Sequence, residues 1–322
     1  MAQAHDTTAP LNEPSAERLA DHPLRFLLAT RPPFLLATAA PVALGWAYAL
    51  HLGYPLDPLL AIATLLAALL LHGAINVIND YHDALNGTDE QNTGRLHPFT
   101  GGSRFIQNGI LDLHQTRRLA LTLFALAALI GLGLGLVTSP GLYLLGLGGV
   151  LIGWGYSAPP LALNSRGLGE LAVALGFSLL PAGAFWVQSA ALDSNALLIG
   201  LPGGLLTAAL LYINQFPDRQ ADAQAGKRHW VVRLAPRQAR WGYPLLLVLA
   251  YGGLLLLVVQ SRLPPAALAG LLALPMSLFA AHQLLTHADN PSQLAPAIRL
   301  TIAALLALVL LQALGLALST PS

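Results

Sequence analysis

Long runs of apolar residues, separated by short polar or Gly/Pro-rich segments, fill most of the chain after residue 31. Each run has roughly 17 to 25 residues, the length at which an α-helix crosses the hydrocarbon core of a bilayer. Prolines inside several runs are compatible with membrane helices, because neighbouring helices can satisfy the freed backbone groups. The pattern predicts an all-α polytopic membrane bundle of nine transmembrane helices, over residues 34–53, 57–78, 118–137, 141–157, 168–189, 195–213, 242–260, 264–284 and 296–317.

The composition agrees with a membrane protein. Hydrophobic residues make up 55% of the 322 residues and charged residues only 10%, against roughly 25% charged residues in a soluble domain. A soluble enzyme and a disordered chain are therefore both excluded. The formal net charge of +1 gives no strong field for binding nucleic acid. The absence of cysteine excludes disulfides, thiolate metal sites and cysteine nucleophiles.

The basic residues predict how the chain is oriented. Fifteen of the 16 Lys and Arg residues fall on one side of the nine-helix topology, and Arg262 alone falls on the other. Because Lys and Arg accumulate in cytoplasmic segments, we expect the N-terminus in the cytoplasm and the C-terminus outside, in the inner (plasma) membrane. Residues 1–30 lack the apolar block of a signal peptide and are predicted to be a cytoplasmic arm. Residues 31–318 are predicted to be a single transmembrane domain.

A short motif recurs where the second and sixth predicted helices enter two long cytoplasmic loops, 79–117 and 214–241. The segments INDYHD (78–83) and INQFPD (213–218) both read I-N-x-aromatic-x-D, at an offset of 135 residues. A single Asn or Asp at a helix end is usually a cap, but capping explains neither the repetition nor the Asn-to-Asp spacing. Internal repeats in membrane proteins commonly place a site at the repeat interface. The two acidic clusters are therefore expected to face one another.

The residue types in these clusters favour a magnesium site. Residues four apart share one face of a helix, so each motif can present several oxygen atoms in one direction. Such hard oxygen ligands suit Mg²⁺, which typically takes one or two carboxylates, waters and substrate phosphate oxygens. We therefore expect a metal-bridged diphosphate, with nearby Arg95, Arg104, Lys227 and Arg228 available to pair with its charge. The predicted metal ligands are Asn79, Asp80, Asp83, Asp218 and Asp222.

The segments NDYHDALNGTD (79–89) and DRQAD (218–222) resemble the two aspartate-rich motifs of the UbiA superfamily of membrane prenyltransferases. Three further stretches are similar to that family: RPPFLLATAAPVALG (31–45), TGGSRFIQNG (100–109) and YSAPPLALNSRGLGE (156–170). The resemblance implies a bundle with a central cavity open to the cytoplasmic side. It also implies that Mg²⁺ holds an isoprenyl diphosphate while an aromatic acceptor is alkylated. Diphosphate contacts are then expected from Arg31, Arg104, Arg166, Lys227 and Asn214.

One departure from the family pattern bears on the acceptor. The commoner first motif is N-D-x-x-D-x-x-x-D, and here its last position is Gly87, with Asp89 two residues on. Either Asp89 or Asp80 could then supply the missing ligand. This G-x-D variant is similar to the branch of the family that prenylates 1,4-dihydroxy-2-naphthoate in menaquinone synthesis. That acceptor is therefore expected, with 4-hydroxybenzoate or another quinone or lipid acceptor as the alternative.

The expected chemistry assigns catalytic roles to Asp83, Asp218 and Tyr156. Metal and cationic side chains would stabilise the departing diphosphate, and an aromatic face would stabilise the allylic cation left behind. A cation-coupled secondary transporter is the rival class of function. Transporter sites usually lie near the bilayer midplane at broken helices, whereas these carboxylates lie at the predicted cytoplasmic helix ends. Their position favours the enzyme.

Overall fold

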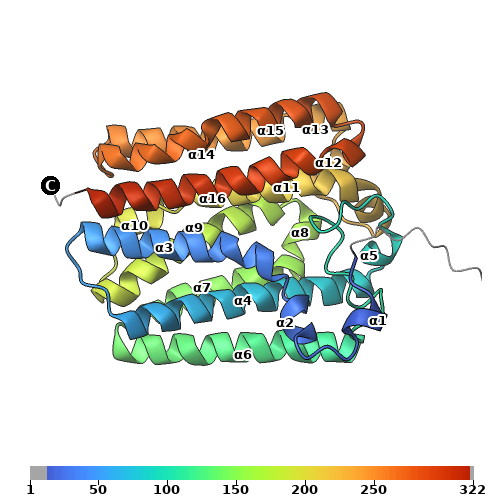
Figure 1. Ribbon diagram of the computed structural model, residues 1–322, viewed down its shortest axis with the longest axis horizontal. Helices are drawn as coiled ribbons and strands as arrows, with labels where there is room; N and C mark the ends of the chain where they lie inside the picture. Colours follow the sequence, from blue (N-terminus) through green and yellow to red (C-terminus); the bar gives the residue numbers. More distant parts are fainter. Residues whose placement is uncertain (1–12, 320–322) are drawn as a thin grey trace, which may run out of the picture.

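The regular structure of this chain is helical throughout the part that the computed structural model describes, residues 13–319. Residues 1–12 of the predicted arm lie outside the described residues. The long helices lie side by side along the length of the bundle (Figure 1). They are α3 (Leu36–His51), α4 (Pro58–Leu85), α6 (Leu113–Val137), α7 (Leu142–Ser157), α9 (Gly169–Ser189), α11 (Leu201–Gln224), α14 (Gly242–Val259), α15 (Leu274–His287) and α16 (Ala295–Leu318).

Shorter helices connect or precede the long ones. They are α1 (Ala16–Leu19), α2 (Arg25–Ala29), η1 (Pro32–Leu35), α5 (Thr88–Gln91), α8 (Leu163–Arg166), α10 (Ser194–Leu198), α12 (Trp230–Arg233), α13 (Pro236–Ala239), η2 (Pro265–Ala273) and η3 (Pro291–Gln293). Two long helices begin at aspartate caps. Asp57 accepts backbone N–H bonds from Leu59 and Leu60 at the start of α4, and Asp112 forms a capping box with Gln115 at the start of α6.

Eight helical segments within residues 13–319 are long and apolar enough to cross a membrane. The predicted fourth span, 141–157, corresponds to α7, which is apolar but has only 16 residues. A ninth crossing, by α7, stays a prediction. Large side chains on the outside of the bundle remain exposed, among them Leu129, Leu136 and Leu144 at 66%, 80% and 77%. Such an apolar surface suits lipid, and the chain is an integral membrane protein.

The boundaries of two helices differ from the prediction in a way that matters for the site. The second and sixth spans are predicted to end at residues 78 and 213, with the acidic motifs at the helix ends that enter the two loops. The helices extend further than predicted, α4 to Leu85 and α11 to Gln224, so both motifs lie entirely within the last turns of these helices. Polar residues can remain helical there because they find polar partners, such as the hydrogen bond from Asn79 to Asp83 one turn along α4, instead of facing lipid.

Glycines allow the central helices to approach one another closely. A Cβ atom at Gly45 of α3 would clash with the backbone of Pro181 in α9, and one at Gly204 of α11 would clash with the backbone of Ala174 in α9. Small residues at helix interfaces replace the missing hydrophobic driving force in lipid by close van der Waals packing. Because α9 is held tightly against both α3 and α11, these three helices give the carboxyl end of α11 a fixed position.

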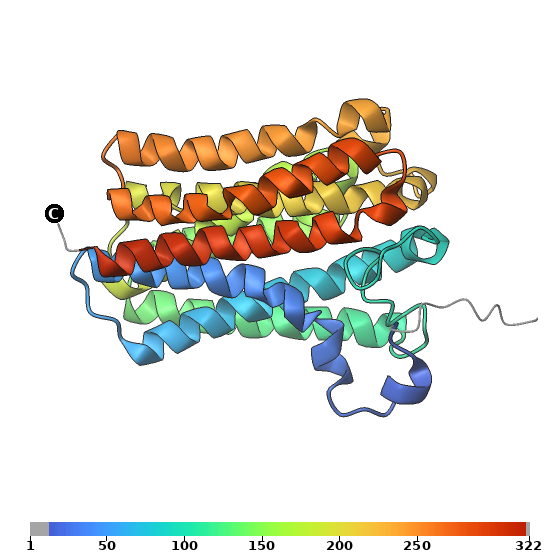
Figure 2. The ribbon, with the colours of Figure 1, turned by 45° about the horizontal axis from the view of Figure 1, so that its top comes forward.

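The carboxyl ends of α4 and α11 lie at the same end of the bundle, close to α1 and α5, while α16 ends at the opposite end (Figures 1 and 2). Figure 2 also shows α1 and α2 beside the loop that follows α5. The two copies of the repeated motif therefore reach one region, although 135 residues separate them in the sequence.

Candidate active site

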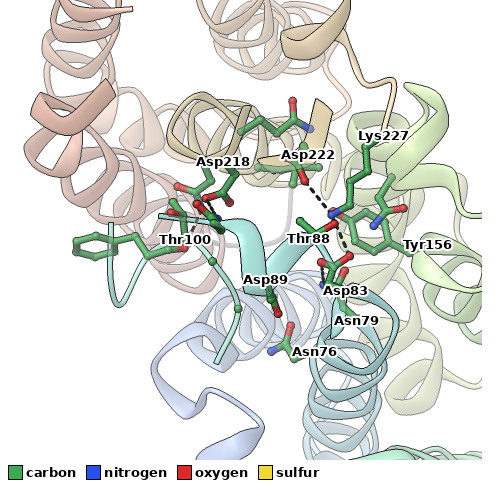
Figure 3. A pocket seen from close by; sticks show the side chains of 18 of the residues that line it. Asn76, Asn79, Asp83, Thr88, Asp89, Thr100, Tyr156, Asp218, Asp222 and Lys227 are labelled. Atoms are coloured by element: carbon green, nitrogen blue, oxygen red, sulfur yellow. Dashed lines mark hydrogen bonds and ion pairs between the residues drawn. The ribbon is translucent and has the colours of Figure 1, made fainter. Parts of the chain in front are cut away.

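A polar cavity of about 210 Å³ lies between the last turns of α4 and α11, and α5 and the loop that follows it also line this cavity (Figure 3). Aromatic and apolar residues from α4, α7, α11 and the start of the bundle complete its wall. The lining residues are Arg31, Phe34, Ile75, Asn76, Asn79, Asp83, Thr88, Asp89, Asn92, Phe99, Thr100, Gly101, Gly102, Tyr156, Asn164, Leu211, Asn214, Gln215, Asp218, Asp222, Lys227 and His229.

The first motif directs one carboxylate into this cavity and another away from it. Asn79 donates a hydrogen bond of 2.8 Å from Nδ2 to Oδ2 of Asp83, one turn along α4. Asp80 is 4% exposed and accepts a hydrogen bond of 3.2 Å from the backbone N–H of Ser103. Asp80 does not line the cavity; it anchors the loop that covers the site.

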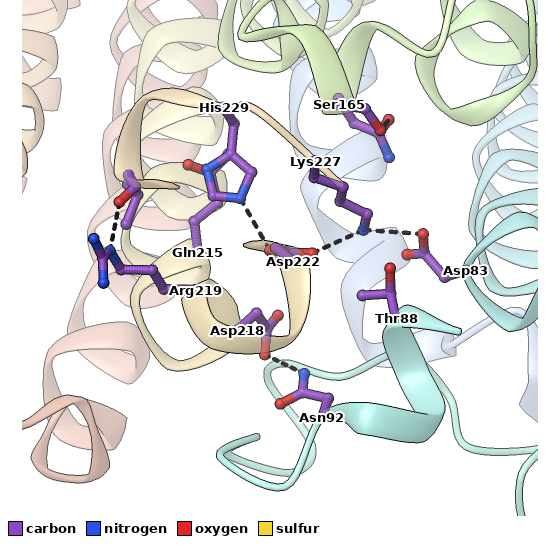
Figure 4. A network of polar contacts seen from close by, with 12 residues as sticks. Asp83, Thr88, Asn92, Ser165, Gln215, Asp218, Arg219, Asp222, Lys227 and His229 are labelled. Atoms are coloured by element: carbon purple, nitrogen blue, oxygen red, sulfur yellow. Dashed lines mark hydrogen bonds and ion pairs between the residues drawn. The ribbon is translucent and has the colours of Figure 1, made fainter. Parts of the chain in front are cut away.

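The second motif places two further carboxylates on the opposite wall. Asp218 Oδ1 accepts a hydrogen bond of 2.6 Å from Asn92 Nδ2, which comes from the loop after α5. Asp222 lies 3.0 Å from His229 Nε2 through its Oδ2 atom. Figure 4 shows both contacts. Because α11 carries Asp218 and Asp222 one turn apart, both side chains project toward the motif on α4.

Lys227 joins the two motifs. Its Nζ atom lies 2.9 Å from Asp83 Oδ1 and 2.9 Å from Asp222 Oδ1, and both ion pairs are buried (Figure 4). Burial opposes the charge on Lys227, but the Asp83 and Asp222 carboxylates outweigh it and raise the pKa of the ammonium group above its ordinary value. The ammonium group of Lys227 thus lies between carboxylates of the two motifs, which would otherwise repel each other.

Asp89, from α5, adds a fourth carboxylate to the cavity wall. Its side chain is 2% exposed, and its Oδ2 atom has no hydrogen-bond partner within the described residues. Burial raises the pKa of Asp89 well above its ordinary value, and the charges of Asp83 and Asp80 raise it further. Arg104 fixes α5 by donating a hydrogen bond to the backbone carbonyl of Asp89. Arg104 therefore does not line the cavity.

Gly102 allows the covering loop to pass directly over these carboxylates. Its φ angle is +70°, and a Cβ atom there would lie 2.6 Å from Asp89 Oδ2 and 3.0 Å from Asp80 Oδ1. Gly109 has a φ angle of +67°, yet a Cβ atom there would meet nothing within 4 Å. The two glycines share the left-handed conformation and differ in what surrounds them.

We expect Gly102→Ala to lower the activity of this site by about tenfold or more, whereas Gly109→Ala leaves it close to normal. Both variants should lose about 1 kcal/mol of stability, because an L-residue is strained in the left-handed region. Only the alanine at 102 also displaces the Asp89 carboxylate. Turnover and thermal unfolding of the two purified variants would be compared with wild type. Equal activity of the two variants would contradict a role for the close approach at Gly102.

Arg31 and Asn214 approach the cavity from opposite sides and reach the same atom. Arg31 Nη2 and Asn214 Nδ2 lie 3.4 Å and 3.5 Å from the backbone carbonyl oxygen of Phe99. The Arg31 guanidinium also lies over the ring of Phe34, at 4.5 Å from its centroid. Both contacts to Phe99 are long hydrogen bonds, so these donors can turn toward an anion in the cavity at small cost.

The structure brings eight of the eleven predicted site residues to the cavity: Arg31, Asn79, Asp83, Tyr156, Asn214, Asp218, Asp222 and Lys227. It does not bring Asp80, Arg104 or Arg166 there. Arg166 is exposed and donates to the carbonyl of Pro160 at 2.6 Å. Arg95 and Arg228, the other basic residues near the motifs, are also absent from the lining.

Sequence reasoning missed several polar residues of the cavity. They are Asn76, Thr88, Asn92, Asn164, Gln215 and His229. Asn76 lies one turn before Asp80 on α4, so the helical period could have identified it as a neighbour of the motif. His229 follows Lys227 by two residues, but no ligand pattern marked it. Asn92 gave no signal, because only the fold of the loop brings it to Asp218.

The oxygen atoms of the cavity fit a hard divalent cation such as Mg²⁺. Asp89 Oδ2, Asn92 Oδ1 and Asn214 Oδ1 are buried without hydrogen-bond partners inside the described residues, which is costly unless a ligand satisfies them. No three His, Asp or Glu side chains between residues 13 and 319 form a ready-made metal cluster. Mg²⁺ does not require one, because it usually combines one or two carboxylates with waters and substrate phosphate oxygens.

A second, mostly apolar cavity of about 510 Å³ adjoins the first. Arg31, Phe34, Phe99 and Gly102 line both cavities. Its apolar wall comes from the start of α3, from α11 and from α16, and the amino-terminal arm closes another side. Among its lining residues are Leu28, Pro32, Pro33, Leu36, Ala37, Phe105, Leu210, Ile302, Leu305 and Leu306. A polar pocket thus opens directly onto a larger apolar one.

Solved structures with the same fold include a UbiA homologue from Archaeoglobus fulgidus bound to geranyl diphosphate (GPP) and Mg²⁺. It is 17% identical to this chain, with a TM-score of 0.63 over 87% of this chain and 99% of that one. At this identity the likeness shows the fold alone.

Sequence comparisons show the family. The model of the UbiA prenyltransferase family matches residues 38–303. A 1,4-dihydroxy-2-naphthoate octaprenyltransferase of Mycobacterium tuberculosis is 31% identical over 69% of this chain and 73% of its own length. The Escherichia coli protein of the same name is 30% identical over 82% of this chain and 85% of its own length. From the extent of these matches, we conclude that the chain is a membrane prenyltransferase and belongs to the UbiA prenyltransferase family.

Proposed function

We propose that this enzyme transfers an isoprenyl group from a prenyl diphosphate to 1,4-dihydroxy-2-naphthoate, with Mg²⁺ assisting the loss of diphosphate. One observation carries the proposal: two matched Asn/Asp motifs, on α4 and α11, face each other across a cavity that opens onto an apolar pocket. A diphosphate needs the first environment and an isoprenyl chain needs the second. The junction between them is where the reacting carbon would lie.

The proposed metal ligands are Asn79, Asp83, Asp218 and Asp222, together with Asp89. Asp89 replaces the acid missing at Gly87, because it lines the cavity while Asp80 is turned toward Ser103. Mg²⁺ bound there would stabilise the negative charge that develops on the departing diphosphate. Lys227, Arg31 and Asn214 are the proposed diphosphate contacts. Each has a side-chain nitrogen at the cavity, and charge-assisted bonds to phosphate oxygens are the strong ones.

The isoprenyl chain is proposed to lie in the apolar cavity between α3 and α16. Leaving of the diphosphate creates allylic cation character at the first carbon of the chain, which aromatic faces stabilise by up to about 2 kcal/mol each when desolvated. Tyr156 lies beside Asp83 and Lys227 (Figure 3), and Phe34 and Phe99 line both cavities. Phe34 and Phe99 lie at the junction of the two cavities and are the proposed aromatic groups nearest the reacting carbon, and Tyr156 is proposed to add an aromatic face from the polar side.

The transfer balances without an external reductant or oxidant. The bond between the first isoprenyl carbon and the diphosphate oxygen breaks, and a bond from that carbon to the aromatic ring forms. With a naphthoate acceptor, the carboxylate leaves as carbon dioxide and the electron pair of its bond returns to the ring. With an acceptor that carries hydrogen at the attacked position, a proton leaves instead.

The identity of the relatives supports the choice of acceptor. Two relatives about 30% identical to this chain are named 1,4-dihydroxy-2-naphthoate octaprenyltransferases. A Synechocystis relative that is 30% identical over 54% of this chain is named a 2-carboxy-1,4-naphthoquinone phytyltransferase. All three names specify a bicyclic aromatic acceptor with a carboxyl group. The G-x-D form of the first motif favours the same acceptor.

The site end of the bundle is proposed to face the cytoplasm. Arg95, Arg104 and Lys227 all lie in segments around the site, whereas Arg262 follows the opposite end of α14, as the distribution of basic residues in membrane proteins requires. Residues 31–318 are proposed to act as one transmembrane domain in the inner membrane, with residues 1–30 as the arm. The prenyl diphosphate can then reach the site from the cytoplasm or from the inner leaflet.

Mass spectrometry of the lipid product tests this function most directly. Purified enzyme in lipid nanodiscs would receive a prenyl diphosphate and one of three acceptors: 1,4-dihydroxy-2-naphthoate, 4-hydroxybenzoate or homogentisate. We expect Mg²⁺-dependent pyrophosphate release and a decarboxylated, prenylated product with the naphthoate alone. A product from hydroxybenzoate alone would contradict the acceptor. Absence of pyrophosphate release with every acceptor would contradict the reaction.

A further inference from the structure

A partly buried ion pair joins the described part of the amino-terminal arm, from residue 13 onward, to the loop that covers the active site. Arg95 Nε lies 2.7 Å from Glu13 Oε1, and Arg95 Nη2 lies 3.1 Å from Glu13 Oε2. The Glu13 side chain is 4% exposed. Asn108 adds a second attachment through a hydrogen bond of 2.6 Å to the backbone carbonyl of Pro14. A two-pronged arginine–carboxylate pair fixes orientation as well as distance, so this part of the arm has one defined position.

Arg95 is also connected to the second acidic motif through hydrogen bonds of Asn92. Arg95 Nη1 donates a hydrogen bond of 2.6 Å to the backbone carbonyl of Asn92. The side chain of Asn92 in turn donates to Asp218 Oδ1 at 2.6 Å (Figure 4). Three successive short contacts thus connect Glu13 to Asp218, a proposed metal ligand. Gly101, with a φ angle of +77°, lets the loop backbone pass directly over the Arg95 side chain.

The arm also forms one wall of the apolar cavity. Glu13, Pro14, Ser15, Arg18 and Leu19 line it, opposite residues of α3 and α16. Ala16 and Leu19 pack against a small apolar cluster that includes Phe105 and Leu111. The arm therefore contacts the proposed isoprenyl pocket at one point and is connected to the proposed metal site at another.

We propose that Glu13 and Arg95 are positioning residues, which couple docking of the arm over the apolar cavity to the orientation of Asp218. This inference rests on the proposed function, since it gives the metal ligand a partner outside the cavity. When the pair is broken, the arm loses its anchor and Asn92 is no longer held by Arg95. Asp218 then samples more orientations, so metal and diphosphate bind more weakly. The chemical step is unchanged once both are bound.

Glu13→Ala tests the coupling, with Glu17→Ala as its matched control. Glu17 lies on the same arm and is exposed. We expect Glu13→Ala to raise the Mg²⁺ concentration for half-maximal activity and the KM for prenyl diphosphate about tenfold, since hydrogen bonds to charged groups are stronger than those between neutral groups. The kcat at saturating Mg²⁺ and substrate should stay within about twofold. Glu13→Gln, which keeps one acceptor oxygen for Arg95, should give an intermediate value.

A second measurement follows the arm without depending on catalysis. Because the chain has no cysteine, Glu17→Cys provides a single attachment point for a spin label. We expect an immobilised label in the otherwise wild-type protein and a mobile one after Glu13→Ala. Adding Mg²⁺ with inorganic pyrophosphate to the Glu13→Ala protein should partly restore immobilisation, because binding at Asp218 favours the docked arm by linkage.

The outcomes separate this inference from the proposed function. If the wild-type enzyme is active and the Glu13→Ala and Glu17→Ala variants need the same Mg²⁺ concentration, the coupling is overturned. A freed arm with an unchanged Mg²⁺ requirement overturns it too, as does an equal fall in kcat and kcat/KM with an unchanged KM. A wild-type protein that transfers no isoprenyl group overturns the proposed function, while the spin label still reports whether Glu13 holds the arm and whether pyrophosphate redocks it.

Discussion

Asp83→Ala and Asp218→Ala each abolish prenyl transfer, with an expected fall in turnover of at least 10²- to 10³-fold, the order of magnitude for losing one electrostatic contact to a developing charge. The two carboxylates lie on opposite walls of the cavity, one on α4 and one on α11, so neither can replace the other. Pyrophosphate release and product mass would be measured on purified variants, over a range of Mg²⁺ concentrations.

Asp289→Ala is the matched control for these two variants. Asp289 forms an ion pair with Arg237 on the surface, and the two side chains are 56% and 79% exposed. Its removal should change turnover less than twofold, because exposed ion pairs contribute little. Both active-site variants should still insert into membranes and elute as folded protein. Normal turnover in either of them would remove that aspartate from the metal site.

Lys227→Met has the second-largest expected effect, a loss of kcat/KM of about 10²-fold or more. Methionine has nearly the length of lysine, so packing is conserved while the charge between Asp83 and Asp222 disappears. Removing one partner of a buried ion pair leaves uncompensated charge and typically costs about 3–5 kcal/mol. We therefore expect a lower unfolding temperature and a weaker affinity for diphosphate in the same variant.

The neighbouring Arg228 provides a control with the same substitution. Arg228 is exposed, and its side chain does not line the cavity. Arg228→Met should keep kcat/KM within about twofold and leave the unfolding temperature unchanged, since surface substitutions usually change stability by under 0.5 kcal/mol. Lys227→Arg keeps the charge and should be less impaired than Lys227→Met. Equal activity of the methionine variants at 227 and 228 would contradict a role for Lys227 at the diphosphate.

Local sequence patterns identified the acidic residues of the site better than its basic residues. The repeat of Asn and Asp at helical spacing placed the motif oxygens on one face of each helix, and Asp83, Asp218 and Asp222 do face a common cavity. Basic residues were less predictable. Arg95 pairs with Glu13, which is 82 residues away, and Arg104 pairs with the backbone of Asp89. A guanidinium near a diphosphate and one that holds a loop look identical in a sequence.

The choice between Asp80 and Asp89 also depended on the tertiary structure. Both acids lie within ten residues of each other, and spacing alone left them equivalent. The covering loop brings the Ser103 N–H to Asp80, which satisfies that carboxylate, whereas Asp89 Oδ2 has no partner among residues 13–319. The orientation of a loop side chain depends on contacts with residues distant in sequence, and no local pattern encodes them.

Sequence patterns were enough to identify the class of this protein, its apolar membrane helices and the pair of acidic motifs. These features follow from hydrophobicity and helical period, which act between near neighbours in the chain. The packed structure was needed to show that α4 and α11 extend to Leu85 and Gln224, that Lys227 lies between the two motifs, and that Glu13 is connected to Asp218. Those contacts join residues far apart in sequence, and they form only when packed helices bring buried charges together, where each must find a partner.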